Sequence, residues 1–250
     1  MIADLGTMFW KEWRSLVGGR ARRQVLLTGG MLSIWAVWFP IQMGGQDWVS
    51  DPVPMAIQAI VLPMVIVGIV VPDAVAGERE RHTLSTLLAS RLSDRTILYG
   101  KLVFAILVGW LAAPVMLAVA LVVANLAAFD AAPLFYDPAV FAGVLALGLL
   151  VAVLTGAVGI FVSLRAGTAQ EAQQLTLIGL MMPLMLLGFG ATALLSSNRA
   201  MVRDLIDFLG GTEAKLIALA VMGILLIIDA GLVLAADRRF RRGRLLHRGS

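Results

Sequence analysis

Six long apolar stretches constrain this chain more than any other feature of its sequence. They cover residues 25–43, 55–76, 102–126, 139–162, 174–196 and 215–236. A helix that crosses the hydrocarbon core of a bilayer needs about 20 consecutive, mostly apolar residues. Hydrophobic residues make up 60% of the chain and charged residues only 14%, which leaves too little polar surface for a soluble domain of 250 residues. The sequence therefore predicts an all-α integral membrane protein, with six transmembrane helices in a single domain over residues 1–250.

The basic residues alternate between the connections of these spans. All but three of the 20 Lys and Arg residues lie in the leader (1–24), the second loop (77–101), the fourth loop or the tail after residue 236. Cytoplasmic loops are enriched in Lys and Arg, so we expect a multi-pass protein of the plasma (inner) membrane with both termini in the cytoplasm. The arginine-rich tail suits anionic lipid headgroups. The net charge of +4 therefore predicts contact with membrane lipids and not with nucleic acid.

The leader, residues 1–20, is predicted to form an amphipathic helix. Its apolar residues follow steps of three and four, which gather them on one helical face: Ile2, Leu5, Met8, Phe9, Trp13, Leu16 and Val17. The opposite face is expected to hold mainly Asp4, Lys11, Glu12, Arg14 and Ser15. Such a helix lies in the headgroup plane, with Phe9, Trp10 and Trp13 at the interface. It is either a passive anchor or a lever that touches a cytoplasmic partner.

A charged segment, "GERERHTLSTLLAS" over residues 77–90, separates the second and third spans. Four charged residues are followed by leucines at positions 84, 87, 88 and 92, a spacing that places them on one helical face. The segment is too short and too charged to span. We expect a cytoplasmic helix with the charged run at its start and the leucine face against the membrane or a protein. Ser93 is predicted to cap the helix that follows.

This segment resembles the cytoplasmic loop of the type-2 ABC transporter permeases, the small six-span exporter subunits. The matching positions are Glu78, Arg79, Glu80, Arg81, Thr83, Leu84, Leu87, Leu88, Ile97, Leu98, Gly100 and Lys101. His82 stands where that family usually has Gly. A second likeness covers the fourth loop and the start of the fifth span, at Ala169, Gln170, Ala172, Gln173 and Gln174. The "WKEWR" of the leader is similar to the N-terminal helix of the family.

The resemblance implies a coupling helix that docks on a separate cytoplasmic ATP-binding subunit. Its docking residues would be Glu78, Arg79, Glu80, Arg81, Thr83, Leu84, Leu87 and Leu88. The sequence has no G-x-x-x-x-G-K-[ST] segment to cradle phosphates, so we expect no catalysis and no cofactor on this chain. ATP and Mg would be used by the partner. The resemblance implies a second permease copy, with a homodimer expected, and export of a small cation, drug or lipid-like substrate.

Two aspartates near or inside the spans are candidates for a transport path. A carboxylate at the depth of Asp229 is costly in a membrane and is a functional candidate by default. It could bind a cation or pair with a cationic group, or it could be a protonated acid or make a structural hydrogen bond. Asp73, at the end of the second span, fits an interfacial position better than a substrate ligand.

Other function classes lack the residues that they require. The chain has no cysteine and only two histidines, so disulfides and thiolate sites are excluded and no metal site is predicted. An intramembrane enzyme would need H-E-x-x-H or paired aspartates. A non-transporting scaffold or sensor stays an alternative. Gly148, Ala152 and Gly156 form a stripe of small residues that predicts close helix packing, within the bundle or at a dimer seam.

Overall fold

The computed structural model describes residues 2–18, 20–83, 92–128, 132–197 and 212–239, and the regular structure of these residues is entirely helical. Six helices are long and apolar enough to cross a membrane. They lie at Arg22–Met43, Pro52–Glu80, Asp94–Ala127, Pro138–Ser163, Ala169–Gly190 and Lys215–Arg238. The six predicted spans are therefore confirmed, and most of these helices extend a few residues beyond the predicted boundaries.

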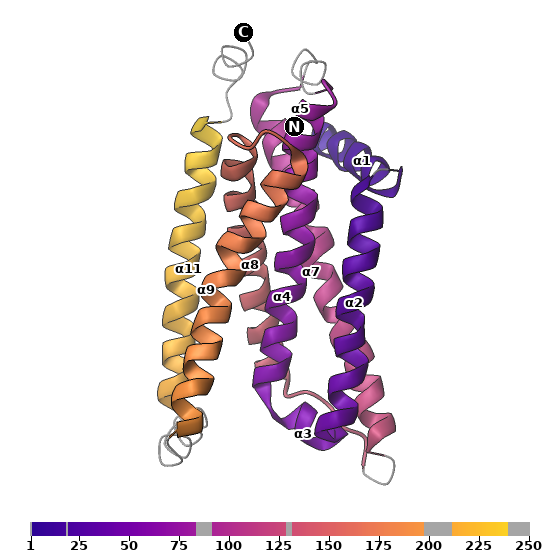
Figure 1. Ribbon diagram of the computed structural model, residues 1–250, viewed down its shortest axis with the longest axis vertical. Helices are drawn as coiled ribbons and strands as arrows, with labels where there is room; N and C mark the ends of the chain where they lie inside the picture. Colours follow the sequence, from indigo (N-terminus) through magenta and orange to yellow (C-terminus); the bar gives the residue numbers. More distant parts are fainter. Residues whose placement is uncertain (1, 19, 84–91, 129–131, 198–211, 240–250) are drawn as a thin grey trace.

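The long helices run side by side along one axis (Figure 1). They are α2 (Arg20–Met43), α4 (Pro52–Pro72), α7 (Asp94–Ala127), α8 (Pro138–Ser163), α9 (Ala169–Ser197) and α11 (Thr212–Arg239). The leader forms α1 (Ile2–Gly18), which lies across this axis at one end of the bundle (Figure 1). Aspartate side chains cap α4 and α8 through the backbone N–H groups of Val53 and Ala139. Ser93 caps α7 by accepting from Thr96 N, as predicted.

The centre of the bundle is α4, which packs against both α7 and α8. Pro63 has no N–H to donate, so the carbonyl of Ala59 receives no helical hydrogen bond from it. Gly148 of α8 lies directly against that carbonyl, and a Cβ at residue 148 would be only 2.4 Å from Ala59 O. Ala152 and Gly156 are buried on the same side of α8. The small-residue stripe thus packs helices within one chain.

The end of the bundle opposite α1 holds a short helix that the sequence did not predict, α3 (Gly45–Ser50). Gly45 packs so closely on Ala124 that a Cβ would lie 1.9 Å from the carbonyl oxygen. The buried Trp48 donates its Nε1 hydrogen to the Tyr136 hydroxyl at 3.3 Å, and this hydroxyl donates to Leu117 O at 3.1 Å. The first loop is therefore a packed element, fixed by tertiary contacts.

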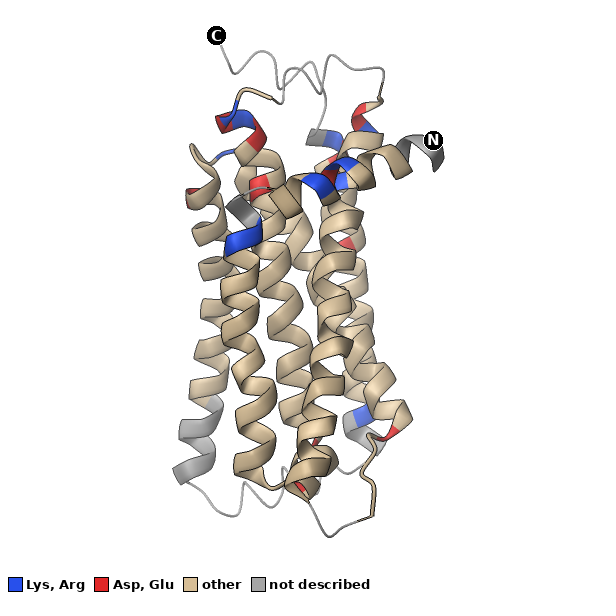
Figure 2. Cartoon of the chain, turned by 90° about the vertical axis from the view of Figure 1, so that its right-hand side faces the viewer, with Lys and Arg blue, Asp and Glu red and all other residues tan. Residues whose placement is uncertain are grey.

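Charged residues are concentrated near the ends of the bundle, mostly at the end where α1 lies (Figure 2). We call this end the charged end. The long middle section is almost free of charge (Figure 2). Many large apolar side chains of α2, α9 and α11 are exposed along it, among them Ile34, Leu187 and Ile227. Such an outward-facing apolar surface is what a helical protein presents to lipid.

Candidate functional site at the charged end

The second span changes its winding where the charged segment begins. After Pro72, the chain continues as a π-helical turn, η1 (Asp73–Gly77), and a last α-turn, α5 (Glu78–Glu80). A π-turn inserts one extra residue and is frequent at functional sites. A Cβ at Gly77 would lie 2.9 Å from Asp73 Oδ1 and 3.1 Å from Arg81 Nη1. Gly77 therefore leaves room for the ion pair between these two residues.

This helix ends in a Schellman motif. Thr83 N donates to Glu78 O at 2.9 Å and His82 N donates to Arg79 O at 3.0 Å, the two bonds that define the motif. His82 occupies the left-handed position with φ of 57°, where Gly is the usual residue. The charged run therefore terminates the second span. Our expectation that it starts a separate helix was wrong, because the left-handed turn divides it from the leucine segment.

Two lysine and two glutamate side chains meet beneath this turn, and we call them the ion cluster: Lys11, Glu12, Glu78 and Lys101. Lys101 Nζ lies 2.9 Å from Glu12 Oε1 and 2.9 Å from Glu78 Oε2. It donates hydrogen bonds to Glu12 Oε1 and, at 2.8 Å, to the carbonyl of Ala74, while its contact with Glu78 is an ion pair. Lys11 pairs with both carboxylates. The ion cluster joins α1, α5 and α7 with balanced charge.

Burial and pairing act in opposite directions on these groups. Burial alone would raise the pKa of Glu12, but the neighbouring ammonium groups of Lys101 and Lys11 hold the pKa below its ordinary value of 4.5. Burial alone would lower the pKa of Lys11, yet the carboxylates of Glu12 and Glu78 raise the pKa above 10.5. Both groups are therefore ionised at neutral pH. Lys101 and Glu12 are almost fully buried, with 2% and 4% exposure.

The other charges of the run contact different elements. Arg79 donates to the carbonyls of Leu164 and Ala166, just after the end of α8, where a cation also offsets the helix dipole. Glu80 accepts from Ala169 N, the first residue of α9, at 3.2 Å. Arg81 lies 3.2 Å from Asp73 in its own π-turn. We call residues 78–81 the clamp, because together with Lys11 and Lys101 they connect α1, α7, α8 and α9.

The second sequence likeness packs directly against the first. Ala172 of α9 is fully buried and forms one apolar cluster with Ala76 of η1 and Ala166. Gln173 donates to the Ile69 carbonyl of α4 at 3.3 Å and to Gln24 of α2 at 3.2 Å. The start of α9 is therefore packed against the last turns of the second span, just before the clamp.

Helix α1 presents two different faces. Phe9, Trp10 and Trp13 are 40%, 58% and 47% exposed, in positions that suit a membrane interface. Phe9 also stacks edge-on against Phe104 of α7, with ring centroids 5.0 Å apart. Glu12 was expected on the polar outer face, but this expectation was wrong. It points into the bundle beside the buried Met8, because Lys101 supplies a buried partner charge there.

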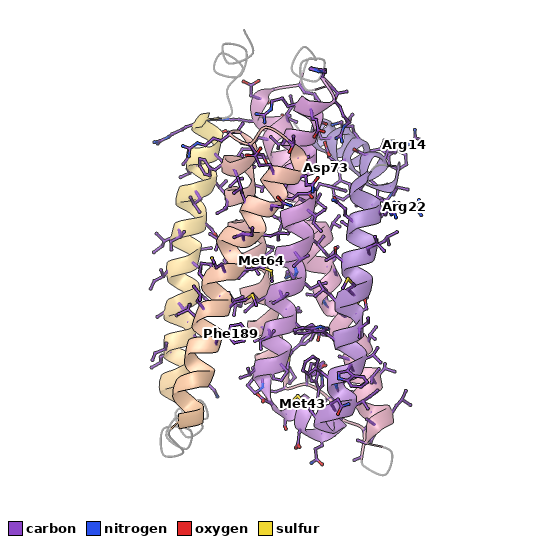
Figure 3. The ribbon with its side chains drawn as sticks, viewed as in Figure 1. Arg14, Arg22, Met43, Met64, Asp73 and Phe189 are labelled. Atoms are coloured by element: carbon purple, nitrogen blue, oxygen red, sulfur yellow. The ribbon has the colours of Figure 1, made fainter. Side chains whose placement is uncertain are left out.

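The remaining predicted residues separate into three groups. Thr83 belongs to the Schellman turn, where its hydroxyl donates to Glu78 O, and Asp73 pairs with Arg81 near the charged end (Figure 3). Asp229 lies inside α11 and is 3% exposed. The three coupling leucines, Leu84, Leu87 and Leu88, lie outside the described residues. The two aspartates do not form a hydrogen-bonded pair, since neither Asp229 oxygen has a hydrogen-bond partner within the described chain.

Sequence reasoning missed the ion cluster. Lys101 was noted only as a match to a family pattern, and Lys11 and Glu12 only as part of an outer face. A usable signal was present in the spacing, because Glu12 falls four residues after Met8 and four before Leu16, in the middle of an apolar stripe. A lone carboxylate in such a stripe needs a buried cation, and Lys101 at the edge of the third span supplies it.

Six apolar helices, four of which are joined by the clamp and the ion cluster at the charged end, define a multi-pass helical membrane protein. The family model for "ABC-2 family transporter protein" matches residues 55–209, well over half of the chain. This protein therefore belongs to the ABC-2 family of transporter proteins, and it is a permease component of an ABC transporter. A comparison with curated proteins gives no match.

Proposed function

We propose that this chain is the membrane permease of an ATP-driven exporter, working as a dimer with separate ATP-binding subunits. The observation that carries the proposal is the clamp. Residues 78–81 directly precede the leucine segment, and their side chains contact α1, α7, the end of α8 and the start of α9. A force applied to the leucine segment would reach four other elements through these contacts.

In this mechanism the ATP-binding subunit docks on Leu84, Leu87 and Leu88. Apolar docking surfaces supply affinity, while nearby charges fix orientation. Since the clamp side chains bind their own chain, the leucines carry the docking and the clamp transmits the motion. ATP and Mg are held by the partner subunit. The interfacial helix α1 then acts as a lever, because the ion cluster fixes it to the end of the second span.

The proposed arrangement in the cell follows from the charge distribution. The charged end lies on the cytoplasmic side of the plasma (inner) membrane, and both termini are cytoplasmic. Helix α1 lies on the lipid headgroups. A second copy of the chain completes a path for a small cation, drug or lipid-like substrate. Basic residues such as Arg14 and Arg22, which lie at this end (Figure 3), favour anionic lipids.

The test replaces the apolar docking face. The double variant Leu87→Asp with Leu88→Asp should fold and reach the membrane. It should lose substrate-stimulated ATP hydrolysis when it is reconstituted in nanodiscs with its ATP-binding partner subunit. The matched control is Leu87→Met with Leu88→Met, which keeps an apolar face and should retain at least half of the stimulation. Membrane yield and thermal unfolding report on folding in both variants.

Two results would contradict the proposal. If the aspartate variant retains full stimulation, the leucines do not form the docking face. If the parent chain associates with no ATP-binding subunit and stimulates no ATP hydrolysis, a scaffold or sensor explains the molecule better.

A further inference from the structure

Asp229 is buried inside α11, near the middle of a membrane-spanning helix. The residue is 3% exposed, and neither carboxylate oxygen has a hydrogen-bond partner in the described part of the protein. Asp237, the next acidic residue along α11, lies about 12 Å further toward the charged end, at 1.5 Å of rise per residue. Asp229 is therefore well inside the apolar section of the bundle.

Other buried charges in the described chain are handled differently. Glu12, Glu78 and Lys101 are each less than 10% exposed, and each has a partner of opposite charge. The protein thus compensates buried charge at the charged end, where ion pairs form, but not at Asp229. An Asn or Ser at this position would serve a structural role at lower cost, because an ionisable carboxyl at the centre of a membrane-spanning helix is expensive.

The charged groups on the neighbouring helices are already engaged or distant. Among the described residues, the main neighbour of α11 is α8, and α8 contains no ionisable side chain from residue 138 to 163. On α7, Arg95 pairs with Asp237, and Lys101 belongs to the ion cluster. On α9, Glu171 accepts from Gly167 N. No cation of the described chain pairs with Asp229, and neither of its carboxyl oxygens has a hydrogen-bond partner there.

We propose that Asp229 is the binding site for the ammonium group of an amphiphilic organic cation. This inference rests on the proposed function and names the substrate class. The entering ammonium pairs with the carboxylate, and the carboxyl proton leaves to water, so the site stays neutral in both states. Helix α11 lies at the edge of the bundle, with most of its large apolar side chains facing outward, including Ile224 and Ile227, so an amphiphilic ligand would approach it from the bilayer.

The composition of the site favours an organic cation over a metal ion. Alkaline-earth ions take six or more oxygen ligands, and the described residues contain no group of three or more His, Cys, Asp or Glu side chains that could hold a metal. One carboxylate among apolar side chains suits a ligand with a single positive charge and a hydrocarbon body. The apolar residues on the inward side of α11, such as Val233 and Ala236, would contact that body.

The test uses the whole chain in nanodiscs and needs no ATP-binding subunit. Dicyclohexylcarbodiimide, which reacts with protonated carboxyls in apolar surroundings, should label Asp229 but not Asp237, as read by mass spectrometry of the α11 peptide. Tributylmethylammonium should reduce labelling at least fivefold, whereas NaCl at the same concentration should not. Direct binding of the ammonium should tighten about tenfold per pH unit while the carboxyl is protonated, and Asp229→Asn should remove this pH dependence.

Several outcomes would overturn the inference. Absence of labelling means that the carboxyl is not a buried acid, and protection by NaCl alone reassigns the site to a metal ion. A structural role predicts that Asp229→Leu lowers the melting temperature, whereas a ligand site predicts that this variant melts at or above the parent temperature and binds no ammonium. Because ATP hydrolysis is absent from this assay, its failure is separate from a failure of the proposed ATP-driven coupling.

Discussion

At the scale of single residues, buried charges are found where they connect different helices. Lys101 contacts Glu12 of α1, Glu78 of α5 and the Ala74 carbonyl of η1. Removing one member of a buried ion pair leaves an uncompensated charge, which costs about 3–5 kcal/mol. Replacing both partners together by apolar residues changes the free energy of unfolding much less. The importance of the pair therefore lies in specifying which helices meet.

A double-mutant cycle tests this view of the ion cluster. Lys101→Met should lower the melting temperature of the detergent-solubilised protein strongly, because two carboxylates then face only Lys11. Adding Glu12→Gln should recover part of that loss, because the remaining positive charge of Lys11 is then matched by the single negative charge of Glu78. We expect a coupling free energy of about 1–3 kcal/mol. The external control is Arg14→Met on the exposed side of α1, whose effect should add to that of Lys101→Met without coupling.

The residue scale is where sequence reasoning was weakest. The pattern of Glu78, Arg79, Glu80 and Arg81 was recognised, but the partners of these side chains come from four other elements and from residues up to 89 positions away. The spacing of apolar residues shows which residues share a face of one helix. It does not show which other helix packs against that face. The assignment of Glu12 failed for that reason, since only the folded bundle brings Lys101 beside it.

At the scale of helices, the end of the second span shows how local backbone geometry positions the site. The π-turn turns the charged run toward α1, α7, α8 and α9, and the Schellman turn then stops the helix. Residues with a Cβ pay about 1–2 kcal/mol in the left-handed region, a cost that His82 meets at φ of 57°. This geometry explains why glycine suits the position.

Substitutions at His82 should follow the backbone conformation. His82→Gly should keep the stability within about 1 kcal/mol, because relief of the left-handed strain is offset by greater freedom of the unfolded chain. His82→Val should lose about 1–2 kcal/mol, since a β-branched residue fits this region poorly. Melting temperature and the rate of trypsin cleavage after Arg81 measure both effects. Equal stability of the two variants would contradict the left-handed turn.

Helix packing gives a second prediction at this scale. Gly148→Ala should destabilise the bundle by about 1–3 kcal/mol, because the new methyl group would meet the Ala59 carbonyl at 2.4 Å. Gly143→Ala on the same helix is the matched control, since no atom lies within 4 Å of its Cβ position. The control should be neutral or slightly stabilising. The measurement is the melting temperature of the two variants and the parent chain in the same detergent.

Helices were predicted better than contacts because their signals are local. The six spans, the Ser93 cap and the small-residue stripe each follow from the composition or spacing of a few neighbouring residues. Helix α3 was missed because it has only six residues, and a segment so short is stabilised by tertiary packing, here of Gly45 and Trp48, rather than by its own propensity. The π-turn after Pro72 likewise could not be predicted from the spacing of apolar residues.

At the scale of the whole molecule, the separation of charged end and apolar middle sets how the chain lies in a bilayer. The predicted orientation can be tested directly because the chain has no cysteine. In intact bacterial cells, a membrane-impermeant maleimide should label Gln46→Cys, because Gln46 is an exposed residue of α3 at the end opposite α1. It should label Arg14→Cys only after the cells are opened. The reverse pattern would contradict cytoplasmic termini.

The ion cluster also has a consequence for the order of biosynthesis. Helix α1 is made first, but its buried Glu12 has no cation to meet in the bundle until residue 101 has been synthesised and the third span inserted. Until then Glu12 and Lys11 must stay hydrated at the lipid surface, and α1 cannot occupy its final site. Docking of α1 through Glu12 therefore follows the insertion of the third span, which carries Lys101.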